Sequence, residues 1–249
     1  MALVDGVISK CFIGSGAKME MKDVYDLNRH ARENGTSDVW PYTAVMEAVN
    51  SIIEGIDELK EEAPDFYELD RERYVNLLND LYRSIRYYAG SYKLVSYART
   101  EDWMDIYGVH RGSRPGAATV TGIENVYDDQ MWLAREFIRA YKNTGMEGYK
   151  TRAEYLIEYI LDGWDVCVDS RGEEYGGITW GPGYNSKHAC SNSPVISPLV
   201  WMAELYKGSD ETTTYYYVNK DNTRSSKTVN KYEYYLDLSL IHISEPTRH

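Results

Sequence analysis

Hydrophobic side chains recur along this chain mainly with the period of an α-helix. Five stretches show the pattern clearly: 41–59, 74–88, 133–141, 153–161 and 196–206. Pro41 suits the first turn of a helix, and Gly145 and Gly163 suit the ends of the third and fourth stretches. A weaker pattern over 19–33 predicts a further helix. No stretch alternates between hydrophobic and polar positions over several residues, so a large sheet is not expected.

The order of these segments predicts an all-α fold of helical hairpins. Two long loops, 91–127 and 163–192, interrupt the helices, and both are rich in glycine and aromatic residues. Loops of that length in a compact domain usually carry function. The polar segment 208–230 is expected to be a surface excursion, and the acidic run 54–72 a solvated helix end and loop. Such hairpins, packed side by side, form an α/α toroid or a helical solenoid.

Charge and composition narrow the classes of ligand. The 249 residues include 27 Lys and Arg against 39 Asp and Glu, a formal net charge of -12. That charge, with no basic stripe to offset it, argues against a nucleic-acid partner. The 24 Tyr and 6 Trp residues suit neutral sugar rings, because each offers a flat apolar face and a polar tip, although most of the tyrosines are expected to fill helix contacts.

The cysteines, the hydropathy and the N-terminal residues give no sign of a disulfide framework, a zinc site, a membrane span or a signal peptide. Three cysteines, Cys11, Cys167 and Cys190, match neither a disulfide framework nor a zinc pattern. No run is long and apolar enough to span a membrane. Residues 1–20 lack the basic start and apolar stretch of a signal peptide.

Two adjacent carboxylates, Asp128 and Asp129, stand where the first long loop turns into the third helix. One reading is structural: one aspartate caps the helix and the other favours its positive end. The other reading is catalytic, because two close carboxylates do not ionise equally, and a retaining glycosidase needs one ionised and one protonated carboxyl group. A divalent cation site is not expected, since no further oxygen ligands follow at a suitable spacing.

The second long loop offers groups that could face a sugar. Its glycines allow a close backbone approach, and Trp180 and Tyr184 could stack on a pyranose ring. An ordinary glycine-rich loop, with Glu173 and Glu174 among its polar residues, has the same composition. His188 has no Ser-His-Asp pattern around it and is expected to be structural.

Four motifs, taken in order, resemble glycoside hydrolase family 76, the endo-α-1,6-mannanases. They are Tyr127–Ala134, Gly163–Asp165, Gly176–Trp180 and Lys187–Pro194, and Trp40–Tyr42 also matches. The resemblance covers roughly residues 38–207 and implies an (α/α)6 barrel with a retaining mechanism. By position, it implies that Asp128 is the nucleophile and Asp129 the general acid/base. The substrate-binding residues that it implies are Tyr127, Trp132, Trp180, Tyr184, Lys187 and Asn192.

The resulting expectation is a retaining, endo-acting glycoside hydrolase that cleaves the α-1,6-mannan backbone of fungal-type cell walls. The alternatives are another (α/α)6 enzyme, such as an unsaturated-glycuronide hydrolase or a sugar epimerase, and a non-catalytic glycan-binding protein. The expected partner is the polysaccharide alone, without nucleic acid or a membrane span, and the chain is expected to be a monomer. No metal or other cofactor is expected. The resemblance implies a secreted, periplasmic or cell-surface setting.

The end of the chain departs from this pattern. Residues 1–237 are expected to form a partial barrel domain, because fewer than six helical hairpins can be counted, and such a piece should be poorly stable and inactive. A helix beginning near Tyr232 should break at Leu238, with Pro246 inside its expected span. Residues 238–249 resemble a translated sequencing adaptor, so they are expected to be a non-native tail and are excluded from the functional assignment.

Overall fold

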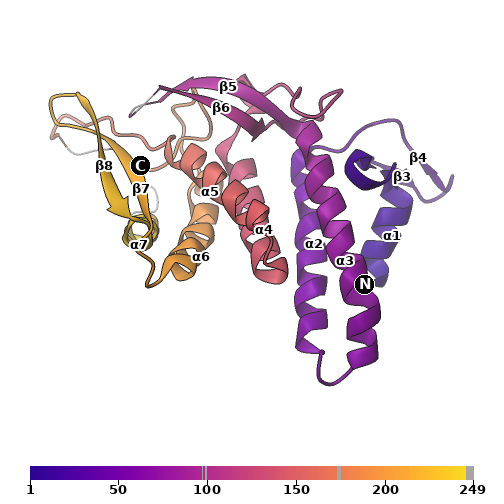
Figure 1. The fold of residues 1–249 in the computed structure, drawn as a ribbon. Helices are drawn as coiled ribbons and strands as arrows, with labels where there is room; N and C mark the ends of the chain where they lie inside the picture. Colours follow the sequence, from indigo (N-terminus) through magenta and orange to yellow (C-terminus); the bar gives the residue numbers. More distant parts are fainter. Residues whose placement is uncertain (97, 99, 173–174, 245–249) are drawn as a thin grey trace.

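The computed structural model describes residues 1–244, apart from residues 97, 99, 173 and 174. Seven α-helices lie in this part of the chain: α1 Ala2–Cys11, α2 Val39–Glu58, α3 Pro64–Ser84, α4 Tyr127–Thr144, α5 Glu147–Leu161, α6 Ile196–Tyr206 and α7 Lys231–Ser244 (Figure 1). The described strands are β1 Phe12–Ile13, β2 Glu20–Met21, β3 Tyr25–Asp26, β4 Ala31–Arg32, β5 Ala89–Val95, β6 Thr100–Tyr107, β7 Thr212–Val218 and β8 Arg224–Asn230. They pair in sequence order as four antiparallel two-stranded sheets.

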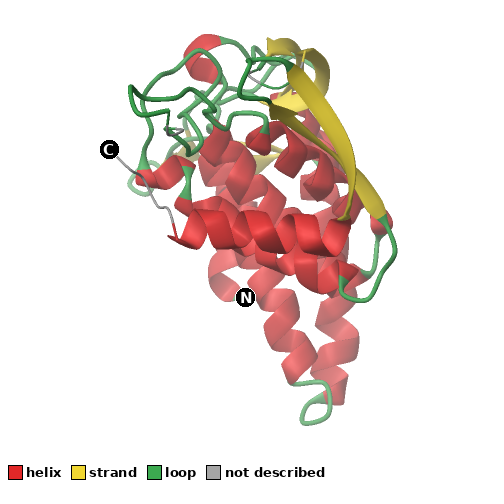
Figure 2. Cartoon of the chain, turned by 90° about the vertical axis from the view of Figure 1, so that its left-hand side faces the viewer, coloured by secondary structure: helices red, strands yellow, loops and turns green. Residues whose placement is uncertain are grey.

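The larger helices form three pairs, α2 with α3, α4 with α5, and α6 with α7. The end of α6 lies beside the start of α7, where Tyr206 stacks on Tyr235. Across the pairs, α2 packs against α4 and α4 against α6, so these three helices form one layer. All three begin at the same end of the molecule, where the loops and the β5–β6 hairpin also gather (Figure 2). The two long loops that precede α4 and α6 are thereby brought to the same end of the molecule.

A buried polar network fixes α2 against α4. The Glu136 carboxylate of α4 is buried; it accepts a hydrogen bond from Asn50 Nδ2 of α2 at 3.0 Å. Arg135 and Arg139 form ion pairs with the same carboxylate at 2.9 and 3.0 Å. Burial raises the pKa of Glu136, and the two arginines oppose that rise. Asn143 Nδ2 donates to Asn50 Oδ1 at 3.1 Å, so the amide has partners on both sides. This network sets the register of the two helices.

The five clear helical patterns are confirmed by α2 to α6, but α3 begins at Pro64, well before the expected start near Tyr74. Residues 64–72 of the acidic run are therefore helical, where a helix end and loop were expected. The helix expected over 19–33 is wrong. The Asp26 carboxylate accepts hydrogen bonds from the backbone N–H groups of Asn28 and Arg29, which makes a turn, and short strands flank it. The N-terminal helix α1 was not predicted.

The helical fold is confirmed in part, but "all-α" omits the hairpins. The loop expected over 91–127 contains most of the β5–β6 hairpin, and the excursion 208–230 is the β7–β8 hairpin. Thr212–Val218 alternates between more and less exposed side chains, and its threonines and tyrosines favour strands. Asn222 adopts φ +63° in the turn, where Asp221 accepts a hydrogen bond from Thr223 N. Closure into an (α/α)6 barrel remains a prediction.

The last helix differs from the expected course. It continues through Leu238 as far as Ser244, and Ser239 is buried while Leu238 packs against the core. The break predicted at Leu238 is therefore wrong: Leu238 keeps its core contact inside the helix, and Ser239 Oγ donates to Leu236 O at 2.7 Å. Residues 245–249, with Pro246, lie outside the described part of the chain. Whether residues 238–249 are native to the protein stays a prediction.

Candidate active site

The paired aspartates lie in the first turn of α4. Val126 occupies the cap position and makes no side-chain cap hydrogen bond, so neither aspartate caps the helix as the structural reading required. Asp128 Oδ1 instead accepts a hydrogen bond from the backbone N–H of Asp129 at 3.1 Å. Both carboxylates still lie at the positive end of the helix dipole, which favours an ionised group there.

Asp129 is set apart from its neighbour by its surroundings. Burial raises the pKa of Asp129 to about 7, with further contributions from the negative charges of Asp128 and Asp38. A carboxyl group with that pKa holds a proton near neutrality and can exchange it, as a general acid/base must. The arrangement therefore supplies a proton donor in the same helical turn as a second carboxylate.

Two neighbours of the aspartates were not predicted from the sequence. Asp38 precedes α2, and its Oδ1 lies 2.6 Å from His110 Nδ1. The Cys190 thiol interacts with the Asp128 carboxylate; burial raises the pKa of Cys190, and the charge and hydrogen bond of Asp128 add to the rise. The only sequence signals were an acidic residue directly before the first long helix and a cysteine inside the Lys187–Pro194 motif.

The second long loop is fastened to the start of α4. The backbone N–H of Tyr127 donates to Trp180 O at 2.9 Å. Gly181 allows this approach, because a Cβ there would lie 2.4 Å from Asn125 O. The partly exposed Trp180 contacts Tyr184 and His188, with ring centroids 4.9 and 5.5 Å apart. The structure thus brings an aromatic group beside the helix that carries the aspartates.

Tyr127 itself is buried, with 1% of its surface exposed. Its ring contacts Tyr159, with centroids 5.2 Å apart, and packs over Gly163, where a Cβ would lie 2.4 Å from the ring. The motif glycine is therefore explained by this close approach. Trp132 lies one turn further along α4, and the Arg135 guanidinium covers its ring at 4.7 Å from the centroid.

Lys187 and Asn192 make contacts within the loop. Lys187 Nζ forms an ion pair with Asp165 Oδ2 at 2.6 Å, which contributes to the lowered pKa of Asp165. Asn192 is buried, and its Oδ1 accepts from Ile178 N at 2.7 Å. Its Nδ2 donates to the carbonyl oxygens of Ile178 and His188, both at 3.0 Å. Since both amide hydrogens are used, the geometry of Asn192 suits shaping the loop more than contacting a sugar.

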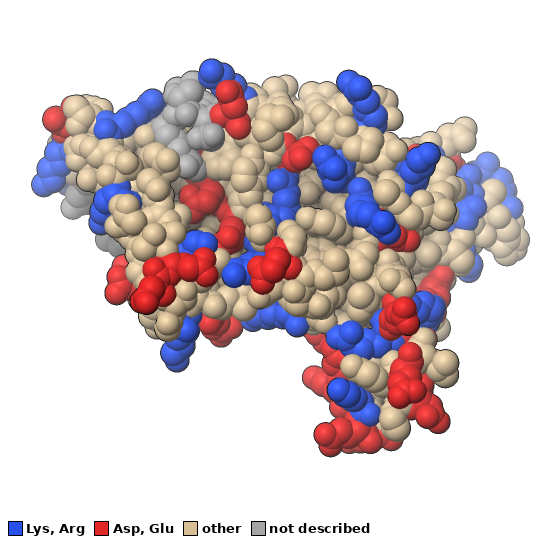
Figure 3. Space-filling view, in the orientation of Figure 1, with Lys and Arg blue, Asp and Glu red and all other residues tan. Residues whose placement is uncertain are grey.

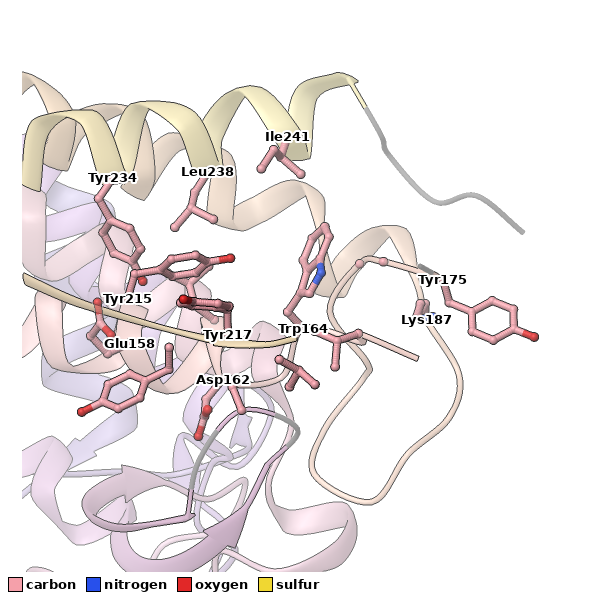
Figure 4. Close-up of a pocket in the computed structure, with 17 residues that line it drawn as sticks. Glu158, Asp162, Trp164, Tyr175, Lys187, Tyr215, Tyr217, Tyr234, Leu238 and Ile241 are labelled. Carbon is pink, nitrogen blue, oxygen red and sulfur yellow. The ribbon is translucent and has the colours of Figure 1, made fainter. Parts of the chain in front are cut away.

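Two cavities lie at the loop end of the molecule. One, of about 450 Å³, is lined by Tyr127, Gly163 and Tyr184 among others. The other, of about 340 Å³, lies between α5, α7 and the β7–β8 hairpin (Figure 4). Its aromatic wall comprises Trp164, Tyr175, Tyr215, Tyr216, Tyr217 and Tyr234. Leu238 and Ile241 also line it, and both belong to the segment predicted to be non-native. Neither lining includes Asp128 or Asp129.

Charge is distributed unevenly on the visible face of the molecule. Acidic side chains gather at the tip of the α2–α3 pair, far from the loop end, where Glu58, Glu61 and Glu62 are exposed (Figure 3). Glu173 and Glu174 lie outside the described residues. Within the described part of the chain, no group of three or more His, Cys, Asp or Glu side chains is arranged to hold a metal ion. The same residues contain no helix with the length and hydropathy needed to cross a bilayer.

Comparison with solved structures shows the fold. A family 76 mannosidase from Bacteroides thetaiotaomicron VPI-5482 matches with a TM-score of 0.60 at 17% identity, over 97% of this chain and 50% of that one. A family 76 glycoside hydrolase from a bovine Bacteroides thetaiotaomicron strain matches at 0.55 and 18%, over 97% and 40%. A family 76 α-mannanase of Bacteroides thetaiotaomicron matches at 0.54 and 17%, over 98% and 51%. The chain thus spans about half the length of these proteins or less.

Comparison by sequence finds one matching family model. No curated protein matches the chain. The sequence model of "Glycosyl hydrolase family 76" matches residues 114–231, a segment that holds the paired aspartates and the whole second loop. Residues 114–231 are therefore similar in sequence to glycosyl hydrolase family 76, and the described chain resembles in fold the matched half or less of that family's solved members.

Proposed function

We propose that the chain carries the catalytic carboxylates of a retaining, endo-acting hydrolase of α-1,6-mannan. The observation that supports this most directly is the pKa of about 7 at Asp129, in the same helical turn as Asp128. A retaining glycosidase requires a proton donor and a nucleophile about 5–5.5 Å apart, and side chains of adjacent residues can reach that separation. The solved relatives named as a mannosidase and a mannanase favour mannose as the sugar.

In the proposed reaction, Asp128 attacks the anomeric carbon of a mannosyl unit. Asp129 gives its proton to the glycosidic oxygen, so the bond to the leaving chain breaks as the ester to Asp128 forms. The Asp129 carboxylate then takes a proton from water. That water attacks the anomeric carbon, releases Asp128 and leaves the new reducing end with its original configuration. Trp180 and Tyr184 are proposed to stack on the sugar beside the cleavage point.

Linear α-1,6-mannan incubated with a complete enzyme that contains this chain tests this proposal, because the partial barrel is expected to be inactive alone. Asp128→Asn and Asp129→Asn should each lower kcat/KM by about 1,000-fold or more, since each removes a group that acts in the transition state. Asp65→Asn is a control at the same helical position, because Asp65 also lies in a first helical turn, that of α3, but is exposed to solvent. It should leave turnover unchanged. Proton NMR of the first product should show the retained anomer.

Two outcomes would point to the alternatives. A double-aspartate variant that still released manno-oligosaccharides would contradict the assignment of Asp128 and Asp129. A complete wild-type enzyme, with both aspartates intact, that bound mannan without cleaving it would favour a non-catalytic glycan-binding protein. A polymeric mannan lies outside cells, so a secreted, periplasmic or surface setting accompanies the proposal.

A further inference from the structure

Trp40 is the most exposed tryptophan of the layer formed by α2, α4 and α6. It lies in the first turn of α2, and 61% of its surface is exposed. Val39 and Tyr42 on either side of it are buried, so Trp40 lies outside the buried face of the helix. Trp132 and Trp201, on α4 and α6, are partly buried, and each ring lies beneath a cation. Trp40 therefore offers an open indole face, and its neighbours decide what that face can bind.

Two contacts further along α2 and α4 fix the register of the two helices. The Arg135 guanidinium of α4 pairs with the Glu47 carboxylate of α2. One turn later, Arg139 Nη2 donates to Ser51 Oγ at 2.8 Å. In both pairs the residue of α4 stands 88 positions after its partner on α2. Since the two helices begin at the same end of the molecule, this offset continues toward both helix starts (Figure 1).

The same offset pairs Trp40 with Asp128. Trp40 precedes Glu47 by seven residues, close to two helical turns, and so shares its face of α2. Asp128 precedes Arg135 by the same interval on α4. The axes of packed helices are about 8–10 Å apart, a gap that one pyranose ring can span. The register therefore sets Trp40 about one sugar unit from the proposed nucleophile.

A short segment of backbone holds the two helix starts together. Val39 N, next to Trp40, donates to Val109 O at 2.9 Å. Two residues earlier in this segment, Tyr107 N donates to Gln130 Oε1 at 3.1 Å, and Tyr107 O accepts from Gln130 Nε2 at 2.6 Å. Gln130 is the fourth residue of α4. Two residues of extended chain span at most about 7 Å, so the first turns of α2 and α4 lie close together, as the register requires.

The surroundings of Trp40 favour a sugar over a protein segment as its partner. The side chain of Asp38, two residues earlier, is 49% exposed, and Asp128 and Asp129 are partly exposed. A protein segment packed over Trp40 would also cover these carboxylates, which costs free energy unless each gains a hydrogen-bond donor. A mannosyl ring meets both needs, because one face carries C–H groups that stack on an indole and its hydroxyl groups can donate to carboxylates.

We propose that Trp40 binds the substrate by stacking on a mannosyl unit that lies across the starts of α2 and α4, next to the unit attacked by Asp128. This inference rests on the proposed function in taking α-1,6-mannan as the ligand. Trp180 and Tyr184 then bind the saccharide from the second loop, and Trp40 binds it from α2. Losing the indole should weaken binding more than it slows the chemical step, since Trp40 contacts no reacting atom.

The experiment uses a complete enzyme that contains this chain, with Asp128→Asn to prevent turnover. Calorimetry should show that Trp40→Ala weakens the binding of α-1,6-mannotetraose about tenfold or more, whereas Trp40→Phe keeps most of the affinity. Leu69→Ala is the control, because Leu69 is 77% exposed on α3, outside this layer, and it should leave binding unchanged. In enzyme labelled with fluorotryptophan, the fluorine NMR signal that disappears in Trp40→Phe should shift when the saccharide is added.

An unchanged affinity in Trp40→Ala, with wild-type circular dichroism, would overturn the inference. A Trp40→Ala variant that melted at a lower temperature but bound the saccharide normally would also overturn it, because the rest of the domain would then cover the indole. Either result leaves the proposed function standing if the enzyme with Asp128 intact hydrolyses mannan. Binding that depends on Trp40, without hydrolysis, would support the inference and count against the proposed function. Where hydrolysis occurs, Trp40→Ala should raise KM with little change in kcat.

Discussion

Asp129 is the residue at which the stability of the fold and the proposed chemistry depend on the same proton. The helical layer buries its carboxyl group and surrounds it with negative charge, so the ionised form is disfavoured. The proton that catalysis requires is therefore also a proton that the folded chain prefers. Activity and stability should consequently both depend on the ionisation of Asp129. Replacing Asp129 with a side chain that does not ionise should lower activity and raise stability.

The stability of Asp129→Asn should depend on pH in a defined way. The pKa of Asp129 is about 7 when folded, against 3.8 as the ordinary value, so its stabilising proton is fully effective below pH 3.8 and its contribution is lost as pH rises through 7. Asparagine does not ionise. The variant should therefore gain stability relative to wild type between pH 4 and 8, by about 4 kcal/mol in total.

Urea unfolding of the wild type and of Asp129→Asn at several pH values measures the difference between their free energies of unfolding. The other titrating groups are common to both proteins, so their contributions cancel in this difference. A gap that stayed constant from pH 4 to 8 would mean that Asp129 titrates normally.

Gly163 allows a test of the packing around Tyr127. Gly163→Ala should destabilise the chain by about 2 kcal/mol, because the new methyl group would overlap the Tyr127 ring. Gly55→Ala is the matched change, since Gly55 lies inside α2 with nothing within 4 Å of the added Cβ. It should stabilise the chain by about 0.5–1 kcal/mol through helix propensity. Thermal melting distinguishes the two, and equal effects would contradict the assigned contact.

At the scale of elements, the sequence predicts those helices whose signals lie within their own residues. The helices α2 to α6 follow from period and end signals within their own residues. The β7–β8 hairpin was missed because Thr212–Val218 alternates in exposure but not in residue type, since its threonines and its tyrosines each come in a run. Ala89–Val95 of β5 likewise shows no regular alternation of hydrophobic and polar residues. Asp38 and Cys190 could not be placed beside Asp128 and Asp129 from sequence, because their proximity depends on how three helices pack.

The contact between α2 and α4 gives a prediction at this scale. Asn50→Ala should cost about 2–3 kcal/mol, because it leaves the buried Glu136 carboxylate with one partner fewer and empties a buried site. Lys93→Ala, which removes an exposed pair with Asp102 at 3.9 Å, should change stability by less than about 0.5 kcal/mol. Chemical denaturation measures both, and a cost below 1 kcal/mol for Asn50→Ala would show that the network does not fix the helices.

For the whole molecule, the net charge of -12 discriminates among polysaccharides. Binding of neutral mannan to the Asp128→Asn variant should change by less than about twofold between about 0.05 and 0.5 M NaCl, because no opposite charges are screened. A polyanionic glycuronan should bind poorly at low salt. Affinity electrophoresis at several salt concentrations measures this. Tight, salt-sensitive binding of the glycuronan would favour the uronic-acid alternative.

The hydrogen bond from Tyr127 N to Trp180 O has a consequence for the motions of the chain. It joins the first residue of α4 to a loop residue more than fifty positions later in the sequence. The α4–α5 pair is the stretch of chain that connects these two residues. Neither end can separate without exposing the other to solvent. The amide protons at the start of α4 and around Trp180 therefore belong to one cooperative opening unit and should exchange with deuterium at a common rate. In such a unit, the helix start that carries the carboxylates and the loop that carries Trp180 fold and unfold together.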